Sequence, residues 1–62
     1  MEAMIMQEYE ELKRLIEEAD SDIKKAEGGN KAAGTRVRKQ MQDIKQAAQA
    51  VRNKVLEMRV TE

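Results

Sequence analysis

Two stretches with a seven-residue apolar repeat, separated by a pair of glycines, constrain the fold of this 62-residue chain more than any other feature. In each stretch the apolar residues follow one another in steps of four and three, which is typical of a helix that packs along one stripe. Gly28 and Gly29 interrupt the repeat, and glycine at such a point favours a helix C-terminus. Asn30, which follows, is a good N-cap for a second helix. The stripe residues are Ile5, Tyr9, Leu12, Ile16, Ala19, Ile23 and Ala26 in the first stretch and Val37, Met41, Ile44, Ala48, Val51, Val55 and Met58 in the second.

The two stretches match when the chain folds back on itself about Asn30. Ile23 then meets Val37, and large residues face small ones in several layers, as interdigitated packing requires. The pattern predicts an all-α fold, an antiparallel two-helix hairpin that forms one domain over the whole chain. The expected elements are a first helix over about residues 2–27, a turn at 28–30 and a second helix over about 31–60.

A hairpin this small does not cover its own apolar stripe. The sequence has no cysteine and no histidine, so disulfides and Cys/His metal sites are not available, and oligomerisation remains. One flank of the stripe is almost uncharged in its middle, which predicts a homodimer interface that completes a four-helix bundle. Gly34, on the stripe beside the turn, predicts a close approach of the two helix backbones. The residues assigned to the dimer interface are Leu15, Ala33, Gln40, Ala47 and Leu56.

The charge is divided between the two halves of the chain, although the net charge is zero. Residues 1–27 carry nine acids and four bases, whereas residues 28–62 carry eight bases and three acids. Such an asymmetry indicates an interaction surface. The bases begin in the first turns of the second helix, where the helix dipole disfavours cations by about 0.3–1 kcal/mol each and phosphate oxygens are well accepted. The predicted nucleic-acid contacts are Lys31, Arg36, Arg38, Lys39, Lys45, Arg52 and Arg59.

The sequence does not support catalysis or metal binding. The paired carboxylates Glu10-Glu11 and Glu17-Glu18 are expected on solvated helix faces, with no cavity to raise a pKa. Residues 29–35 have the glycine spacing of a phosphate-binding loop, but the lysine required after the second glycine is missing and a helix precedes them. We expect no catalytic residue, metal, cofactor, small-molecule substrate or membrane-spanning segment. Tyr9, the one aromatic residue, leaves no stacking platform for single-stranded bases.

Three interpretations of the basic cluster remain open at this point. It is suited to the phosphates of double-stranded DNA, bound without sequence preference because no base-reading side chain stands out. Alternatively, the hairpin is a protein-interaction or assembly module, in which the basic strip of one copy pairs with the acidic face of another. The third interpretation is a solvated face with ion pairs such as Asp20–Arg38 and Glu27–Lys31.

The stretch Gly29 to Lys39, GNKAAGTRVRK, resembles the signature of the bacterial histone-like nucleoproteins first known from chlamydiae, which are linker-histone-like. The similarity covers about residues 8–58. It implies a DNA-binding, nucleoid-associated protein of the bacterial cytoplasm that takes part in chromosome condensation. The family's tail, long and rich in Lys, Ala and Pro, has no counterpart before the sequence stops, so the resemblance is to a short form. The motif positions that carry the implied DNA contacts are Lys31, Arg36, Arg38 and Lys39.

Overall fold

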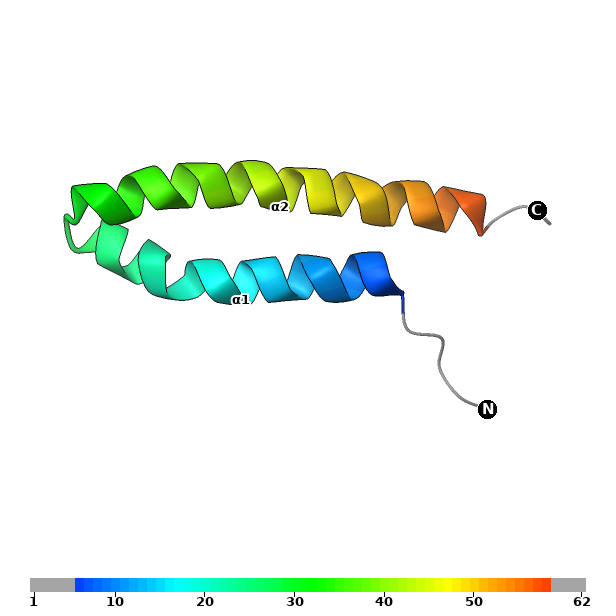
Figure 1. Cartoon of the computed structure of the whole chain (residues 1–62), viewed down its shortest axis with the longest axis horizontal. Helices are drawn as coiled ribbons and strands as arrows, with labels where there is room; N and C mark the ends of the chain where they lie inside the picture. Colours follow the sequence, from blue (N-terminus) through cyan, green and yellow to red (C-terminus); the bar gives the residue numbers. More distant parts are fainter. Residues whose placement is uncertain (1–5, 59–62) are drawn as a thin grey trace.

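The chain folds into two long helices that pack side by side in antiparallel directions, as a computed structural model of residues 6–58 shows (Figure 1). Helix α1 spans Gln7–Glu27 and helix α2 spans Lys31–Glu57. The predicted all-helical hairpin is therefore confirmed. The predicted residues Ile5 and Arg59 lie outside the described residues. Neither described helix is both long enough and apolar enough to cross a membrane.

The turn at residues 28–30 is built as the sequence predicts. Helix α1 ends at Glu27, and Gly29 adopts a φ of 99°, a backbone conformation that favours glycine. Asn30 caps α2, because its side-chain oxygen accepts a hydrogen bond of 2.9 Å from the backbone N–H of Ala33. Local chemistry at these positions is enough to end one helix and start the next.

The stripe along which the helices touch is rotated from the predicted one. Tyr9 and Ile16, both expected on this stripe, are 49% and 51% exposed. The buried residues of the described part are Ala19 and Ala33. The partly buried residues on the contact side follow steps of four and three along a neighbouring stripe: Leu12, Leu15, Ala26, Val37, Gln40, Ile44, Ala47 and Val51.

Small residues and a polar network account for this rotation. Ala19 and Ala33 are fully covered and let the two helices approach closely. On one side of the contact, the Asp22 carboxylate accepts hydrogen bonds from Arg36 at 2.9 Å and from Gln40 at 3.0 Å. Asp22 and Gln40 are partly buried there. The side-chain amide N–H of Gln40 donates to the Asp22 carboxylate across the hairpin, while the buried Oε1 of Gln40 has no hydrogen-bond partner in residues 6–58. Two polar residues therefore occupy positions that an apolar repeat does not reveal.

Four residues that the sequence assigned to a dimer interface lie instead on the contact side of the helices. Ala33 is fully buried in the single chain and has no surface left for a second copy. Leu15, Gln40 and Ala47 are partly buried on the contact stripe. Leu56, the remaining member of the set, is 53% exposed. The exposed apolar residues that could meet a second copy are therefore elsewhere on the hairpin.

The close approach of backbones predicted at Gly34 is wrong. A Cβ atom built at Gly34 meets no atom of α1 within 4 Å. The fully buried residue is Ala33, one position earlier in the chain. The rotated contact stripe explains this difference, because it moves the tightest point of the helix contact from Gly34 to Ala33.

Replacing Asp22 by asparagine is expected to lower the melting temperature at neutral pH and to remove part of its dependence on pH. The hydrogen bond from Arg36 holds the pKa of Asp22 below its ordinary value of 3.8, and the hydrogen bond from Gln40 acts in the same direction. A carboxyl group with a lowered pKa stabilises the folded state fully above its unfolded pKa. That contribution is lost as the pH falls through the folded pKa.

Thermal unfolding of the wild type and Asp22→Asn, followed by circular dichroism, measures this contribution directly. The difference between the two melting temperatures should be constant around neutral pH and should shrink as the pH falls below 3.8. If the difference were as large in strong acid as at neutral pH, the Asp22 carboxylate would not be the source of the stability.

Candidate nucleic-acid interface

Four basic residues form a row along α2, and we call them the cation row: Lys31, Arg38, Lys45 and Arg52. They recur every seven residues, so successive members lie almost in line on the helix surface. At a rise of about 1.5 Å per residue, neighbours are about 10 Å apart and the row is about 32 Å long. All four residues are exposed. A rigid helix thus holds regularly spaced positive charges in solvent.

The cation row is not neutralised by the hairpin itself. Within residues 6–58, none of its four members has a carboxylate oxygen within 4.0 Å. On α1, Lys25 is likewise without such a partner in the described residues. The bases that do have one are Lys13, Arg14, Lys24, Arg36, Lys39 and Lys54. The uncompensated positive charge is therefore concentrated on one line of α2.

The predicted contact residues Arg36 and Lys39 differ from the row, because each is held by a carboxylate. Nη2 of Arg36 donates a hydrogen bond of 2.9 Å to Oδ1 of Asp22 across the hairpin, and this hydrogen bond raises the pKa of Arg36. Lys39 lies 3.0 Å from Asp43, one helical turn further along α2. Both cations remain exposed, yet an anion must compete with a carboxylate to reach them.

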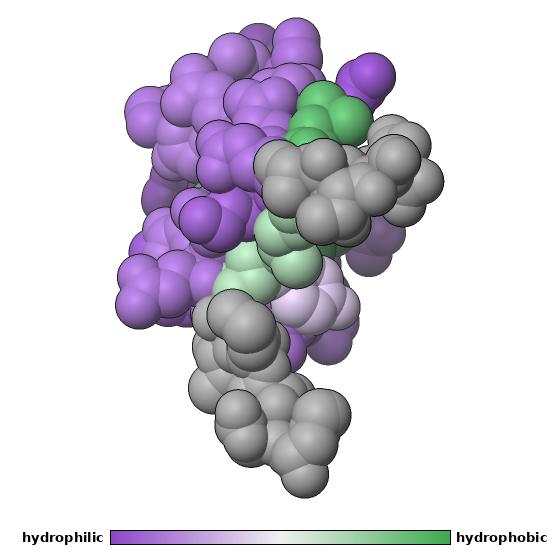
Figure 2. Space-filling model, turned by 90° about the vertical axis from the view of Figure 1, so that its right-hand side faces the viewer, coloured by the Kyte–Doolittle hydropathy of each residue, from purple (hydrophilic) through white to green (hydrophobic). Residues whose placement is uncertain are grey.

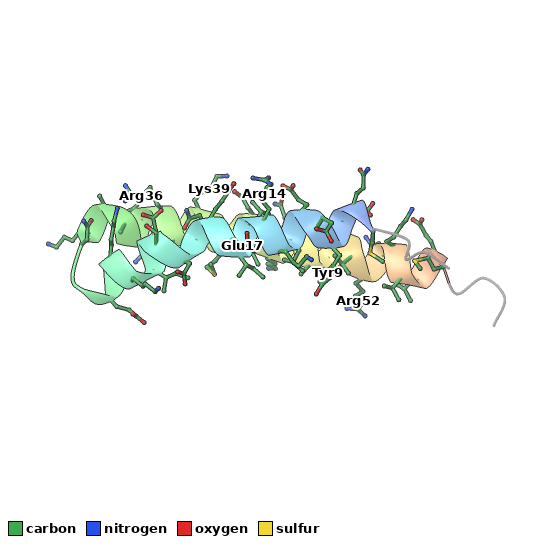
Figure 3. All side chains as sticks on the ribbon, turned by 90° about the horizontal axis from the view of Figure 1, so that it is seen from below. Tyr9, Arg14, Glu17, Arg36, Lys39 and Arg52 are labelled. Atoms are coloured by element: carbon green, nitrogen blue, oxygen red, sulfur yellow. The ribbon has the colours of Figure 1, made fainter. Side chains whose placement is uncertain are left out.

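The two groups of cations also occupy different sides of the molecule. Arg36 and Lys39 project from one edge of the hairpin together with Arg14 (Figure 3). Arg52, from the cation row, projects from the opposite edge, beside Tyr9 (Figure 3). The predicted contact residues therefore lie on two separate surfaces and do not form one continuous patch.

The ion pairs expected for a simple solvated face do not form among the described residues. Asp20 pairs with Lys24 at 3.1 Å, one turn along the same helix, and not with Arg38. Glu27 and Lys31, on either side of the turn, form no pair within 4.0 Å in residues 6–58. Both Arg38 and Lys31 are consequently left for another anion.

The row begins beside the N-terminus of α2. A shallow groove there is lined by Asn30, Lys31, Gly34, Thr35 and Arg38. The first turn of α2 carries no acidic residue. Free backbone amides and the helix dipole make such a terminus attractive to anions, and the two cations add to that attraction. The positive potential of the turn thus continues directly into the cation row.

This geometry defines a class of protein: a helical hairpin that displays fixed cations, with no group of acids, histidines or cysteines in residues 6–58 arranged to hold a metal. A family model described as histone H1-like protein Hc1 matches residues 6–61. The chain belongs to this family, which confirms the resemblance carried by Gly29 to Lys39. The family is one of histone-like, DNA-binding architectural proteins and not a class of enzymes. No curated protein and no solved structure matches the chain.

Proposed function

We propose that the protein binds the phosphate backbone of double-stranded DNA with the cation row and so helps to organise and compact DNA. The observation that supports this most is the row itself, four exposed cations without a carboxylate partner in residues 6–58. Its length of about 32 Å is close to one turn of the duplex, about 34–36 Å. Regularly spaced charges of this kind contact phosphates without reading bases, so binding has little sequence preference.

This mechanism gives smaller roles to the other predicted contact residues, which are Arg36, Lys39 and Arg59. Arg36 and Lys39 contribute less than the row, because DNA displaces Asp22 or Asp43 to reach them. The exposed Lys39–Asp43 pair is worth only about 0–1 kcal/mol, so DNA can recruit Lys39 at a small cost. Arg36 is harder to recruit, because its partner Asp22 is partly buried in the helix contact. Arg59 follows Arg52 by another seven residues in the sequence, and we keep it among the proposed contacts. The protein acts as a homo-oligomer at the nucleoid, in the bacterial cytoplasm.

The assembly-module interpretation has less support. It requires the acidic face of one copy to be free for the basic strip of another. On α1, however, Glu10 pairs with Lys13, and both Glu11 and Glu18 pair with Arg14. Most of that acidic face is thus already satisfied within its own helix, whereas the cation row is not. The imbalance favours an anionic partner from outside, which DNA supplies.

The affinity for DNA is expected to fall steeply as salt is added. The logarithm of the association constant falls by about 0.9 per neutralised phosphate for each unit of log salt. Four or five contacts therefore predict a slope of roughly −3.6 to −4.5, and binding roughly 100- to 500-fold weaker at about 200 mM than at about 50 mM salt.

Fluorescence anisotropy with a labelled duplex measures this slope. Duplexes of equal length and unrelated sequence serve as the control, and they should bind with closely similar affinities. An affinity that barely responds to salt, or that depends strongly on sequence, would contradict binding through the phosphate backbone.

A further inference from the structure

An exposed apolar surface runs along the hairpin and is not used by the proposed DNA contact. We call it the apolar face, and its residues are Tyr9, Ile16, Met41, Ala48 and Val55. The four larger side chains are between 40% and 51% exposed. In the end-on view of Figure 2, hydrophilic residues fill one side of the surface and hydrophobic residues gather toward the other.

The two helices contribute to the same side of this face. Ile16 follows the contact residue Leu15 by one position, and Met41 follows the contact residue Gln40 in the same way. Both helices have the same hand and run antiparallel, so an equal rotation from the contact turns Ile16 and Met41 to one common side. The apolar face is extended along the hairpin by Tyr9, seven positions before Ile16, and by Ala48 and Val55, seven and fourteen positions after Met41.

A single hairpin buries too little to be more than marginally stable by itself. Ala19 and Ala33 are the buried residues of the described part, and no large side chain in it is fully covered. Chains of this length need a disulfide, a metal or an oligomeric contact to supplement so small a core. The sequence has no cysteine or histidine for the first two. An oligomeric contact that covers the apolar face supplies the missing burial.

We propose that the apolar face is a dimerisation surface, covered by the same face of a second copy with both turns at the same end. The two-fold axis then runs parallel to the helices, and α1 of each copy lies against α2 of the other. Residues 1–27 carry a net charge of −5 and residues 28–62 carry +5, so this order keeps helices of like charge apart. Of the acidic face, Glu17 is the member without a cation in residues 6–58 and is left to meet the other copy. This proposal does not depend on DNA binding.

The charges beside the apolar face select this orientation over the reverse one. Arg38 and Lys45 lie three and four residues from Met41, so the cation row borders the face on α2. On α1, Glu17 follows Ile16 and has no cation within 4.0 Å in residues 6–58. Figure 3 shows Glu17 on the outer side of α1. With the turns at opposite ends, α2 would lie against α2 and the two cation rows would repel each other.

The register of the hairpin brings the opposite charges to the same level. The hydrogen bonds of Asp22 with Arg36 and Gln40 fix which residues of the two helices lie side by side. Asp22 is level with residues 36–40 of α2. Because the helices are antiparallel, Glu17, which lies five positions before Asp22, is level with the segment between Arg38 and Lys45. In the proposed dimer, Glu17 of each copy lies beside those two cations of the other. The two cation rows lie on opposite edges of the bundle, and most of their charge stays open to DNA.

The dimer is tested by mass measurement in the absence of DNA. Sedimentation equilibrium of the wild type is expected to give twice 7.1 kDa, while Met41→Glu raises the dissociation constant at least about 10-fold, because each dimer then places two carboxylates in an apolar contact. Gln46→Glu is the matched control, since it adds the same charge at an exposed position of α2 outside the segment that lies beside Glu17, and it should remain dimeric. A wild type of 7.1 kDa at every concentration, or a Met41→Glu variant as dimeric as the control, would overturn the proposal.

A second measurement covers the case in which Met41→Glu does not fold. The melting temperature of the wild type should rise with protein concentration, since folding and association are coupled in the proposed dimer.

The orientation of the two copies is measured with spin labels at Glu27→Cys, which supplies a single labelling site because the chain has no cysteine. Spin labels at Glu27→Cys should lie close together when the turns share one end. A separation near the length of α2, about 40 Å, or a melting temperature independent of concentration would contradict the proposed arrangement.

Discussion

Replacing Arg38, Lys45 and Arg52 together by alanine is expected to weaken binding to duplex DNA roughly 100-fold or more at about 50 mM salt. These residues are exposed and have no carboxylate partner within 4.0 Å in residues 6–58. Their charges are therefore free to displace the counterions of the phosphates, and each lost contact removes about one such displacement. Fluorescence anisotropy with a labelled duplex gives the affinity, and circular dichroism verifies that the helices remain.

The matched control for this variant replaces Arg14, Lys24 and Lys54 by alanine. It lowers the net charge by the same three units, but each of these cations is already paired with a carboxylate of its own helix. We expect its affinity for DNA to change much less than that of the row variant. Equal losses of DNA affinity in the two variants would mean that the total charge decides binding and that the position of the cation row does not matter.

Replacing Ala19 by glutamate is expected to unfold the hairpin. The side chain of Ala19 is 1% exposed, so a longer, charged side chain must either stay unpaired in the contact or push the helices apart. Overpacking and an unpaired buried polar group together cost about 3 kcal/mol or more. That is comparable with the whole stability that so small a core supplies, about 3–5 kcal/mol. The far-ultraviolet circular dichroism of Ala19→Glu should show most of the helical signal lost.

Ser21→Glu is the control for this prediction. Ser21 is exposed and lies two positions further along α1, so the substitution adds the same charge to the same helix without entering the contact. Glutamate is also a slightly better helix former than serine. The control should keep its helical signal and its melting temperature. If Ala19→Glu were as stable as Ser21→Glu, Ala19 would not lie in the helix contact.

The hairpin and its turn could be predicted from the sequence because local rules decide them. Steps of four and three fix the helical period, and the absence of proline leaves each helix uninterrupted. Gly29 supplies the positive φ at the turn, and Asn30 supplies the cap. Each feature depends on a few neighbouring residues and is visible in the order of the letters alone.

The rotation of the helix contact could not be predicted from the same pattern. Leu12, Ala19 and Ala26 belong to both possible stripes on α1, so the choice rests on whether Leu15 or Ile16 faces α2. Both are apolar, and the repeat does not distinguish them. The decision comes from packing across the hairpin, where Asp22 is accommodated by hydrogen bonds that exist only in the folded state.

Only part of the candidate site could be predicted from the sequence, because some of its ion pairs depend on contacts between the two helices. The spacing of seven residues reveals a row from Arg38 through Lys45 to Arg52, and a carboxylate four residues after Lys39 could have indicated that Lys39 is paired. The partner of Arg36 could not be found in this way, because Asp22 is 14 positions distant in the sequence. Only the register and rotation of the two helices bring them together.

The salt dependence of DNA binding, compared between the wild type and the variant with alanine at Arg38, Lys45 and Arg52, tests the central claim most directly. The slope of log affinity against log salt counts the phosphates that the protein neutralises, at about 0.9 per contact. Removing three members of the cation row should make the slope shallower by about 2.7. A variant that binds more weakly with an unchanged slope would show that these residues do not touch phosphates, and would contradict the account.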